Sequence, residues 1–190
     1  WQDEFTAIGT GALYYSEFTI DDVETYHPSD RFQTSTFWII EADASNRLRL
    51  RGIDNEKGVV LVEYILDTPA NPENRPYTVE KRQRASKPPV FGDGSSIKVS
   101  GLFGKYKATV PAASSTDGMP IVLYRAFVYD ENGNEAASVW TLPRYYRAGE
   151  VKKVSLDLPK LEKGAYTVRV VAETAYGVRS DALETTVNAG

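Results

Sequence analysis

The chain has 190 residues, of which 42% are hydrophobic and 25% are charged, so it holds enough apolar material for one large core or two modest ones. Its formal net charge of −4 argues against a nucleic-acid groove or a surface for anionic membranes, because both partners require an excess of basic side chains. There is no cysteine, and His27 is the single histidine. This excludes thiol nucleophiles, disulfide frameworks and Cys/His zinc sites, and it leaves a Ser-His-Asp triad only one base.

Short strands are predicted in the first part of the chain. Aromatic residues make up 12% of the sequence, and β-rich segments occur at residues 18–23 and 36–40. Arginine and leucine alternate over residues 47–51, which predicts a half-buried strand with both leucines on one face and three cations on the other. Residues 59–66 are too few and too β-branched for a helix and apolar enough for a central strand.

A connector is predicted at residues 67–89, where five prolines stand among Asn, Glu, Lys and Arg residues and cannot lie inside a sheet. We place a domain boundary near Ser86, between a small N-terminal β domain at 1–86, a sandwich or a roll, and a second domain at 87–190. The first part has 15 acidic and 9 basic residues and the second has 11 acidic and 13 basic residues, which gives net charges of −6 and +2. Ordinary solvated faces explain this charge asymmetry best; the alternatives are that it orients one half against the other or steers a partner.

The second domain shows a clearer strand pattern. Apolar residues alternate with polar ones over residues 105–110, 154–158 and 166–172. Residues 121–129 form a further strand, and the Asn132-Gly133 pair that follows is a strong hairpin signal. Each of the resulting sheets would have an apolar face that only another sheet can cover. The pattern therefore predicts a two-sheet sandwich, and the whole chain is predicted to be all-β.

The second domain resembles the fibronectin type III family over residues 87–187. Residues 161–170, followed by Ala175-Tyr176-Gly177 and Ser180, are similar to the E–F corner, the F strand and the F–G turn of that family. Residues 117–129 are similar to its B–C turn and C strand. The resemblance implies that Tyr166 is a tyrosine corner whose hydroxyl bonds to the chain upstream. Val110 stands where the family usually has a strand-B tryptophan, which implies a variant core.

Two further resemblances, both to bacterial proteins, suggest where in the cell this chain is found. The second domain is similar to the C-terminal sandwich of secreted calcineurin-type phosphoesterases of gut anaerobes, although none of their metal motifs is present. Trp1, Phe5, residues 8–11 and Tyr14 are similar to short β-modules of surface lipoproteins of the same bacteria. These likenesses imply the outer surface or periplasm of a Gram-negative cell, with a lipid anchor upstream of this sequence.

Three polar segments are candidate sites, and each has a simpler interpretation. His27 lies in a turn-like context and is interpreted as a surface histidine. Asp21, Asp22 and Glu24 gather three carboxylates, but strand alternation would send Asp21 to the opposite face, so we expect no metal there. Residues 130–135 resemble a calcium loop only faintly, and the hairpin already explains their composition.

The strongest candidate for ligand binding is an aromatic and arginine cluster, because sugar rings and extended peptides dock against such groups. A competing interpretation places Trp140 in the core, in compensation for Val110, with the tyrosines over an edge or the seam between the domains. The aromatic pairs Tyr14-Tyr15 and Phe37-Trp38 could likewise belong to a ligand site or to the core. Alternation in a strand turns one ring of each pair outward even without a ligand. The cluster consists of Trp140, Arg144, Tyr145, Tyr146 and Arg147.

The sequence contains no phosphate-binding glycine loop, nucleophile elbow, zinc-protease helix or dinucleotide fingerprint. We therefore predict a non-catalytic adhesion or interaction protein of the cell surface, with a protein or a glycan as partner. No cofactor, metal, nucleic acid or direct membrane span is expected. The alternatives are a glycan-binding accessory module and the non-catalytic C-terminal part of a secreted phosphoesterase or glycoside hydrolase. A third alternative, a stand-alone hydrolase, predicts a cleft with at least two convergent carboxylates or a bound metal.

Overall fold

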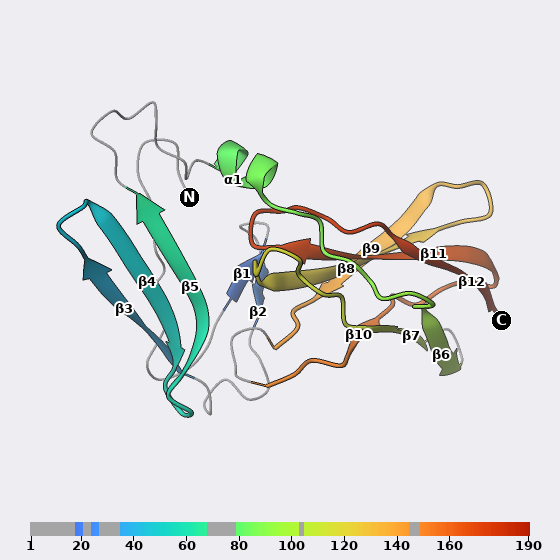
Figure 1. Ribbon diagram of the computed structural model, residues 1–190. Coiled ribbons are helices and arrows are strands. Elements are labelled where there is room, and N and C mark those ends of the chain that lie inside the picture. Colours follow the sequence, from blue (N-terminus) through green and yellow to red (C-terminus); the bar gives the residue numbers. More distant parts are fainter. Residues whose placement is uncertain (1–17, 21–23, 27–34, 68–78, 103–104, 145–148) are drawn as a thin grey trace. The chain divides into compact units, whose positions relative to one another are not determined.

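The computed structural model describes residues 18–20, 24–26, 35–67, 79–102, 105–144 and 149–190 (Figure 1). The chain divides into two compact units, Trp1–Arg82 with Arg144–Gly149 and Gln83–Pro143 with Glu150–Gly190. Strands dominate the described residues, and the helix among them is α1 (Val79–Ala85), so the predicted all-β class is confirmed. No helix in these ranges is long and apolar enough to span a membrane.

The first unit contains two antiparallel sheets in its described part. One has two strands, and the other has three strands in the order β3-β4-β5 (Figure 1). The strands are β1 (Phe18–Ile20), β2 (Glu24–Tyr26), β3 (Thr36–Ala42), β4 (Arg47–Asp54) and β5 (Val59–Asp67).

The alternation predicted for β4 is confirmed. Leu50 is buried at 1% exposure, and Leu48 shares its face. Ion pairs of 2.8 to 2.9 Å neutralise the cations of this strand. They join Arg47 to Asp43, Arg49 to Glu63 and Arg51 to Glu41.

The prediction that residues 59–66 form a central strand is wrong for the described sheet, because β5 lies at its end and β4 in its middle. Two tight turns produce this order. Asn46, with φ of 59°, precedes β4, and the turn after β4 ends at Gly58, with φ of 66°. The buried carboxylate of Asp54 accepts the N–H groups of Glu56 and Lys57 in that second turn, at 3.0 and 3.1 Å. A β-branched run favours a strand, but the turns on either side of β4 decide which strand has two neighbours.

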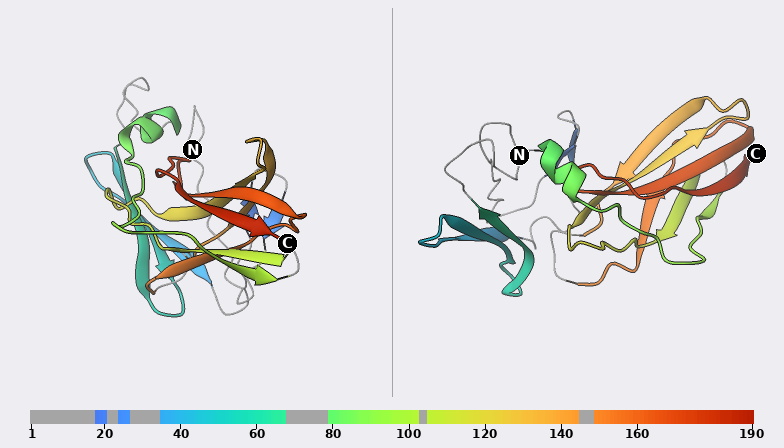
Figure 2. Two further views of the ribbon diagram at one scale, coloured as in Figure 1. Left: turned by 90° about the vertical axis from the view of Figure 1, so that its right-hand side faces the viewer. Right: turned by 45° about the horizontal axis from the view of Figure 1, so that its top comes forward.

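The second unit is a sandwich of two antiparallel sheets, which Figure 2 shows as two layers in yellow-green to red. Its strand orders are β10-β7-β6 and β12-β11-β8-β9. These orders agree with a fibronectin type III-like sandwich, in which β8 and β11 are the strands assigned above as C and F. The strands are β6 (Lys98–Leu102), β7 (Lys105–Pro111), β8 (Ile121–Tyr129), β9 (Glu135–Thr141), β10 (Lys153–Asp157), β11 (Gly164–Thr174) and β12 (Leu183–Ala189).

The core of the sandwich consists of the inward rows of both sheets, as the alternation predicted. Ala126, Val128, Val168 and Val170 are all at 0% exposure on the four-stranded sheet. The three-stranded sheet contributes Ala108, Val110, Val154 and Leu156, all at 5% exposure or less. Val110 is thus a core residue where the family pattern has tryptophan.

The Asn132-Gly133 hairpin is also confirmed, between β8 and β9. Gly133 has φ of 80°, a value that glycine adopts without strain. One carboxylate oxygen of Asp130 accepts the N–H groups of Asn132 and Asn134 at 2.9 and 2.8 Å. Hydrogen bonds from Asn134 are the largest cause that lowers the pKa of Asp130. The segment therefore works as a turn, as its composition indicated.

Tyr124 ties the two sheets together in the way that the resemblance implied for Tyr166. The buried Tyr124 hydroxyl accepts the N–H of Ala113, which follows β7, at 2.8 Å, and burial raises the pKa of this phenol. The ring of Tyr166 lies beside Gly164, but its hydroxyl makes no hydrogen bond to any residue that the structure describes. The upstream bond expected of a tyrosine corner is therefore not made within those residues.

Because the Tyr124 hydroxyl accepts a hydrogen bond and that of Tyr166 makes none with the described residues, we expect phenylalanine to have different effects on stability at the two positions. Tyr124→Phe should lower the free energy of unfolding by about 1 kcal/mol, because it leaves the Ala113 N–H without its acceptor. Tyr166→Phe should change it by less than about 0.5 kcal/mol. Urea denaturation followed by circular dichroism measures both. A larger loss for Tyr166→Phe would show that its hydroxyl, and not that of Tyr124, anchors the chain.

The predicted connector contains a short helix that its prolines did not indicate. Residues of α1 such as Glu80, Lys81 and Arg82 are good helix formers, and Glu80 lies in the first turn, where a negative charge is favourable. After α1, the N–H of Lys87 donates to Asp117 at 2.7 Å. The two units separate between Arg82 and Gln83, four residues before the boundary predicted from composition.

Candidate functional site

Strand β8 sends its side chains alternately into the core and outward. Tyr124, Ala126 and Val128 are buried in the sandwich, so the residues between them lie on the outer face of the four-stranded sheet. These outward residues are Arg125, Phe127 and Tyr129, two aromatic rings and a cation in a single strand.

The register of the neighbouring strands extends this outer face. Residues directly opposite each other in an antiparallel pair share a face. Trp140 of β9 lies opposite Arg125, and Arg169 of β11 lies opposite Phe127. We define the aromatic–arginine face as Arg125, Phe127, Tyr129, Trp140, Arg169 and Arg179.

Arginine and aromatic groups alternate along this face. The Arg169 guanidinium lies 5.2 Å from the ring centre of Tyr129, and that of Arg179 lies 5.8 Å from the ring centre of Phe127. At these distances a cation is attracted to the face of the ring. The aromatic–arginine face therefore has an ordered arrangement of planar groups and not a random scatter of side chains.

Two acidic residues hold the arginines in place. The Nε of Arg169 donates to Glu184 at 2.6 Å, and the Nε of Arg179 donates to Glu173 at 2.9 Å. The hydrogen bond to Glu184, together with its charge, raises the pKa of Arg169. Each bond fixes one edge of a guanidinium, and the planar group is therefore already oriented before any partner arrives.

The most exposed part of the aromatic–arginine face surrounds the two stacked arginines. The side chains of Arg169 and Arg179 are 49% and 51% exposed. Val171 points to the same side as Arg125, which lies opposite it, and is only 7% exposed. Any partner that meets this face should therefore contact Arg169 and Arg179 first.

Trp140 does not fill the core, so that interpretation is corrected. The core receives its neighbour Val139, which lies opposite Ala126, while Trp140 lies on the outer face and is half-buried. The pairing of β9 with β8 sets Val139 opposite the inward Ala126 and Trp140 opposite the outward Arg125, so Trp140 points away from the core.

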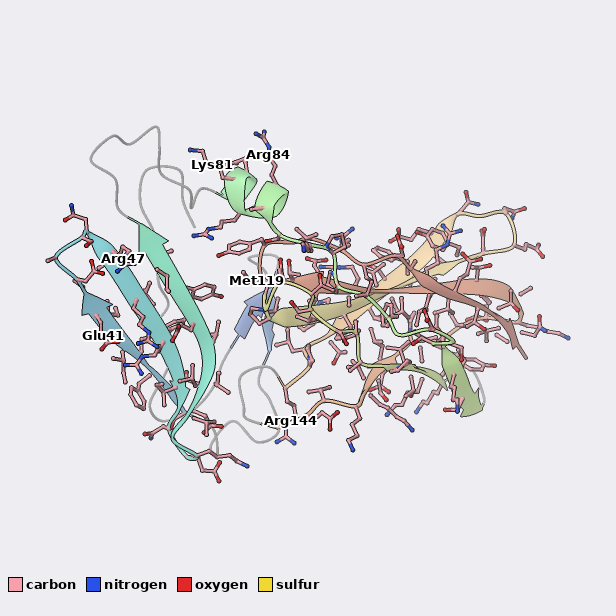
Figure 3. The ribbon with its side chains drawn as sticks, in the orientation of Figure 1. Glu41, Arg47, Lys81, Arg84, Met119 and Arg144 are labelled. Carbon is pink, nitrogen blue, oxygen red and sulfur yellow. The ribbon has the colours of Figure 1, made fainter. Side chains whose placement is uncertain are left out.

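The rest of the predicted cluster is described only in part. Arg144, labelled in Figure 3, is exposed and belongs to the first unit. Trp140 belongs to the second unit. Tyr145, Tyr146 and Arg147 lie outside the described residues. The predicted cluster as a ligand site thus stays a prediction.

The polar candidates of the first unit lie outside the described structure. This holds for His27, Asp21 and Asp22, and for the side chain of Glu24. The same is true of Trp1, Phe5, residues 8–11 and the 14–15 pair. Across the described ranges, no three His, Asp or Glu residues gather in a way that could hold a metal ion.

The 37–38 aromatic pair divides between two faces, as alternation predicted. Trp38 lies on the face of β3 that continues to Gly52 and Val62, and Phe37 lies on the other. A Cβ at Gly52 would lie 2.9 Å from Val62 and 3.5 Å from Trp38, so the glycine makes room for the indole. Trp38 stacks with Tyr64 at 6.2 Å between ring centres. Both rings are half-buried and pack within their own sheet.

Five residues of the aromatic–arginine face were not predicted as site residues: Arg125, Phe127, Tyr129, Arg169 and Arg179. Residues 121–129 were predicted as a strand and residues 166–172 showed alternation, and side-chain alternation in these two strands sends four of the five outward. The sequence signal did not show that β8 and β11 are neighbours, and this pairing brings Arg169 to Tyr129.

The sequence matches no protein-family model, and no curated protein matches it. Several solved structures are similar, among them the following three. The spore cortex lytic enzyme SleM of Clostridium perfringens is 18% identical over 50% of this chain and 27% of that chain, with a TM-score of 0.33. A structure titled as a myokine is 15% identical over 55% of this chain and 97% of that chain, with a TM-score of 0.35. Fibronectin(III)-like modules of CbhA from Clostridium thermocellum are 13% identical over 97% of this chain and 82% of that chain, with a TM-score of 0.31.

The chain thus spans about a quarter of the length of the lytic enzyme. The fibronectin type III-like character of the second unit rests on its strand order and register. Neither a phosphoesterase nor a surface lipoprotein is among these structures, and both likenesses stay predictions.

Proposed function

We propose that this chain is a non-catalytic interaction module, acting in adhesion at the cell surface, and that its aromatic–arginine face binds a partner protein. The observation that supports this proposal is the alternation of Tyr129, Arg169, Phe127 and Arg179 on an exposed sheet face. Trp, Tyr and Arg are the residues that most often dominate the binding energy of protein interfaces. Their orientation by Glu173 and Glu184 lowers the entropy lost on binding.

A protein partner fits this face better than a neutral sugar. Sugar rings stack on open aromatic faces, but the faces of Phe127 and Tyr129 each have a guanidinium over them. A glycan would first have to displace Arg169 and Arg179 from their rings and from their acidic partners. A protein can instead contact the arginine planes themselves. The outer surface or periplasm of a Gram-negative cell is the proposed location.

Glycan binding is the second candidate, and Trp140 supports it. This indole lies on the outer face and is half-buried, next to the segment in which the sequence places further aromatic residues. In that case the chain would serve as an accessory module of a larger secreted enzyme.

Site-specific photo-crosslinking tests the proposal. A benzophenone amino acid at Thr186 of β12, which is exposed opposite Thr167 on the same sheet face as Arg169, should crosslink to one defined surface protein. The same group at Ser155, on the other sheet, serves as the matched control and should not. Arg169→Ala should weaken binding of the purified partner by about tenfold or more, since it removes a fixed guanidinium from the interface.

The outcomes separate the two candidates. Equal crosslinking from Thr186 and Ser155, or an affinity unchanged by Arg169→Ala, would contradict the protein-binding proposal. Hits on a glycan array that disappear with Trp140→Ala and persist with Arg169→Ala would support the accessory-module candidate in its place.

A further inference from the structure

The three-stranded sheet of the sandwich has an outer face of different chemistry. Strands β6, β7 and β10 turn Val99, Ala108 and Leu156 toward the core, so their alternate residues point outward. The register places the outward residues of neighbouring strands side by side. We define the lysine face as Lys98, Lys105, Lys107 and Lys153, together with Ser100, Thr109 and Ser155 between them.

Positive charge is concentrated on the lysine face. It carries four lysines and one outward carboxylate, Asp157, in a chain whose formal net charge is −4. Lys107 pairs with Asp157 at 3.3 Å. Among the residues that the structure describes, Lys98, Lys105 and Lys153 form no ion pair, and all three are exposed. The electrostatic potential over the outer face of this sheet is therefore positive, because three of its four lysines have no acidic partner among the described residues.

Hydroxyl side chains lie among the lysines, and Pro111 lies opposite Lys153 at the end of β7. Thr109 and Ser155 lie opposite each other and share a hydrogen bond of 3.0 Å between their oxygens. Ser100 lies opposite Lys107. No aromatic residue and no arginine stands at an outward position of these strands. This composition contrasts with the aromatic–arginine face of the opposite sheet.

We propose that the lysine face binds a linear acidic polysaccharide, with carboxylates as its charged groups. Lysine ammonium groups on flexible stems act as point charges that can follow carboxylates spaced along a chain. The serine and threonine hydroxyls between them can exchange hydrogen bonds with sugar hydroxyls. Complementarity of charge over an open sheet suits an extended polymer better than a small anion, which requires a pocket.

Other polyanions fit this surface less well. Single-stranded nucleic acids bind through bases stacked on aromatic rings, and the outward positions of these strands have none. Peripheral membrane binding combines basic residues with large apolar groups that insert, whereas Ser100, Thr109 and Ser155 at the middle of the lysine face are polar and Pro111 lies at its end. This inference concerns the opposite sheet from the proposed protein-binding face, so it can fail or hold independently of that proposal.

Binding of fluorescent oligogalacturonate to the full chain tests the inference. At a salt concentration of about 0.1 M we expect saturable binding that weakens as salt increases, because exposed charges are screened. The methyl-esterified oligomer has the same backbone without the charges and should not bind. The triple variant Lys98→Gln, Lys105→Gln and Lys153→Gln should bind oligogalacturonate about tenfold or more weakly, since three exposed charge pairs are lost together.

A second triple variant controls for net charge. Lys81→Gln, Arg84→Gln and Lys87→Gln remove the same charge from α1 and the connector, where Lys81 and Arg84 project from one side of the helix (Figure 3). This variant should lose less than about twofold in affinity. Equal losses for both triple variants, or no saturable binding by the wild-type chain, would overturn the inference. Tighter binding of linear polyphosphate than of oligogalacturonate would also overturn the inference, because it would favour a phosphate polymer as the ligand. Unchanged thermal unfolding of both variants shows that the exposed glutamines are tolerated.

Discussion

Leu156→Ala is expected to lower the free energy of unfolding of the sandwich by about 3 kcal/mol. Leu156 is 1% exposed on β10, where it lies opposite Ala108 of β7 and belongs to the core between the two sheets. Truncation removes apolar contacts and leaves a cavity, because neighbouring residues on paired strands cannot collapse into the space. Hydrogen–deuterium exchange of β8 and β11 peptides reports the stability of this unit separately from the first.

Val90→Ala is the control for Leu156→Ala. Val90 belongs to the same unit and is 48% exposed, and its backbone bridge to Ser114 does not depend on the side chain. We expect a change within about 0.5 kcal/mol. Similar losses for both variants would mean that the two sheets do not enclose a close-packed core.

Gly101→Ala is expected to destabilise the sandwich by about 2 to 3 kcal/mol, through overlap with the backbone of the next strand. A Cβ at this position would lie 2.1 Å from the carbonyl oxygen of Lys105 and 2.7 Å from the Cα of Tyr106. Gly101 and Tyr106 are opposite residues in the pairing of β6 with β7. A backbone cannot give way as a flexible side chain does, so β6 must shift away from β7.

Gly92→Ala separates this overlap from the general effect of adding a methyl group. A Cβ at Gly92 would meet nothing closer than the Ser95 hydroxyl at 4.0 Å. Alanine there should be neutral or stabilise slightly, because it restricts the unfolded chain. Exchange of the β6 and β7 amide protons should accelerate in Gly101→Ala and not in Gly92→Ala. Equal protection in both variants would show that the β6–β7 pair accommodates a side chain at position 101.

The two sheets of the sandwich give it two surfaces with different binding chemistry. The outer face of the four-stranded sheet has aromatic rings beneath oriented arginines, whose ion pairs with Glu173 and Glu184 leave little net charge. The outer face of the three-stranded sheet has lysines and hydroxyls with a positive field. Together, the two proposals would have this module hold a protein on one side and an acidic polymer on the other.

Local patterns predicted those features of the chain that depend on neighbouring residues. Alternation over residues 105–110, 154–158 and 166–172 identified the inward row of each strand, because successive side chains in a strand point to opposite faces. The Asn132-Gly133 hairpin followed from the backbone freedom of glycine in a tight turn. Local patterns did not predict whether a strand lies in the middle or at the edge of a sheet. The apolar run that forms β5 was predicted to be central but lies at an edge, because the same run can pair on one side or on both.

The candidate site could be predicted only in part. The sequence brought Trp140 to attention because it has arginines and tyrosines nearby in the chain, of which Tyr145, Tyr146 and Arg147 lie outside the described residues. Its partners on the outer face come from β8 and β11, and residues 125, 140 and 169 are far apart in sequence. The register of three strands therefore decided which groups share the aromatic–arginine face.

From the sequence alone, this protein is determined to be an all-β chain that has inward and outward rows of side chains, a net negative charge, a single histidine and no cysteine. The tertiary structure decided which rows lie together: which strand is central, on which side of the sheet Trp140 lies, and which arginine covers which ring. The physical reason is that alternation is a local property of the extended backbone, whereas strand order and register come from hydrogen bonds and packing between segments distant in the chain.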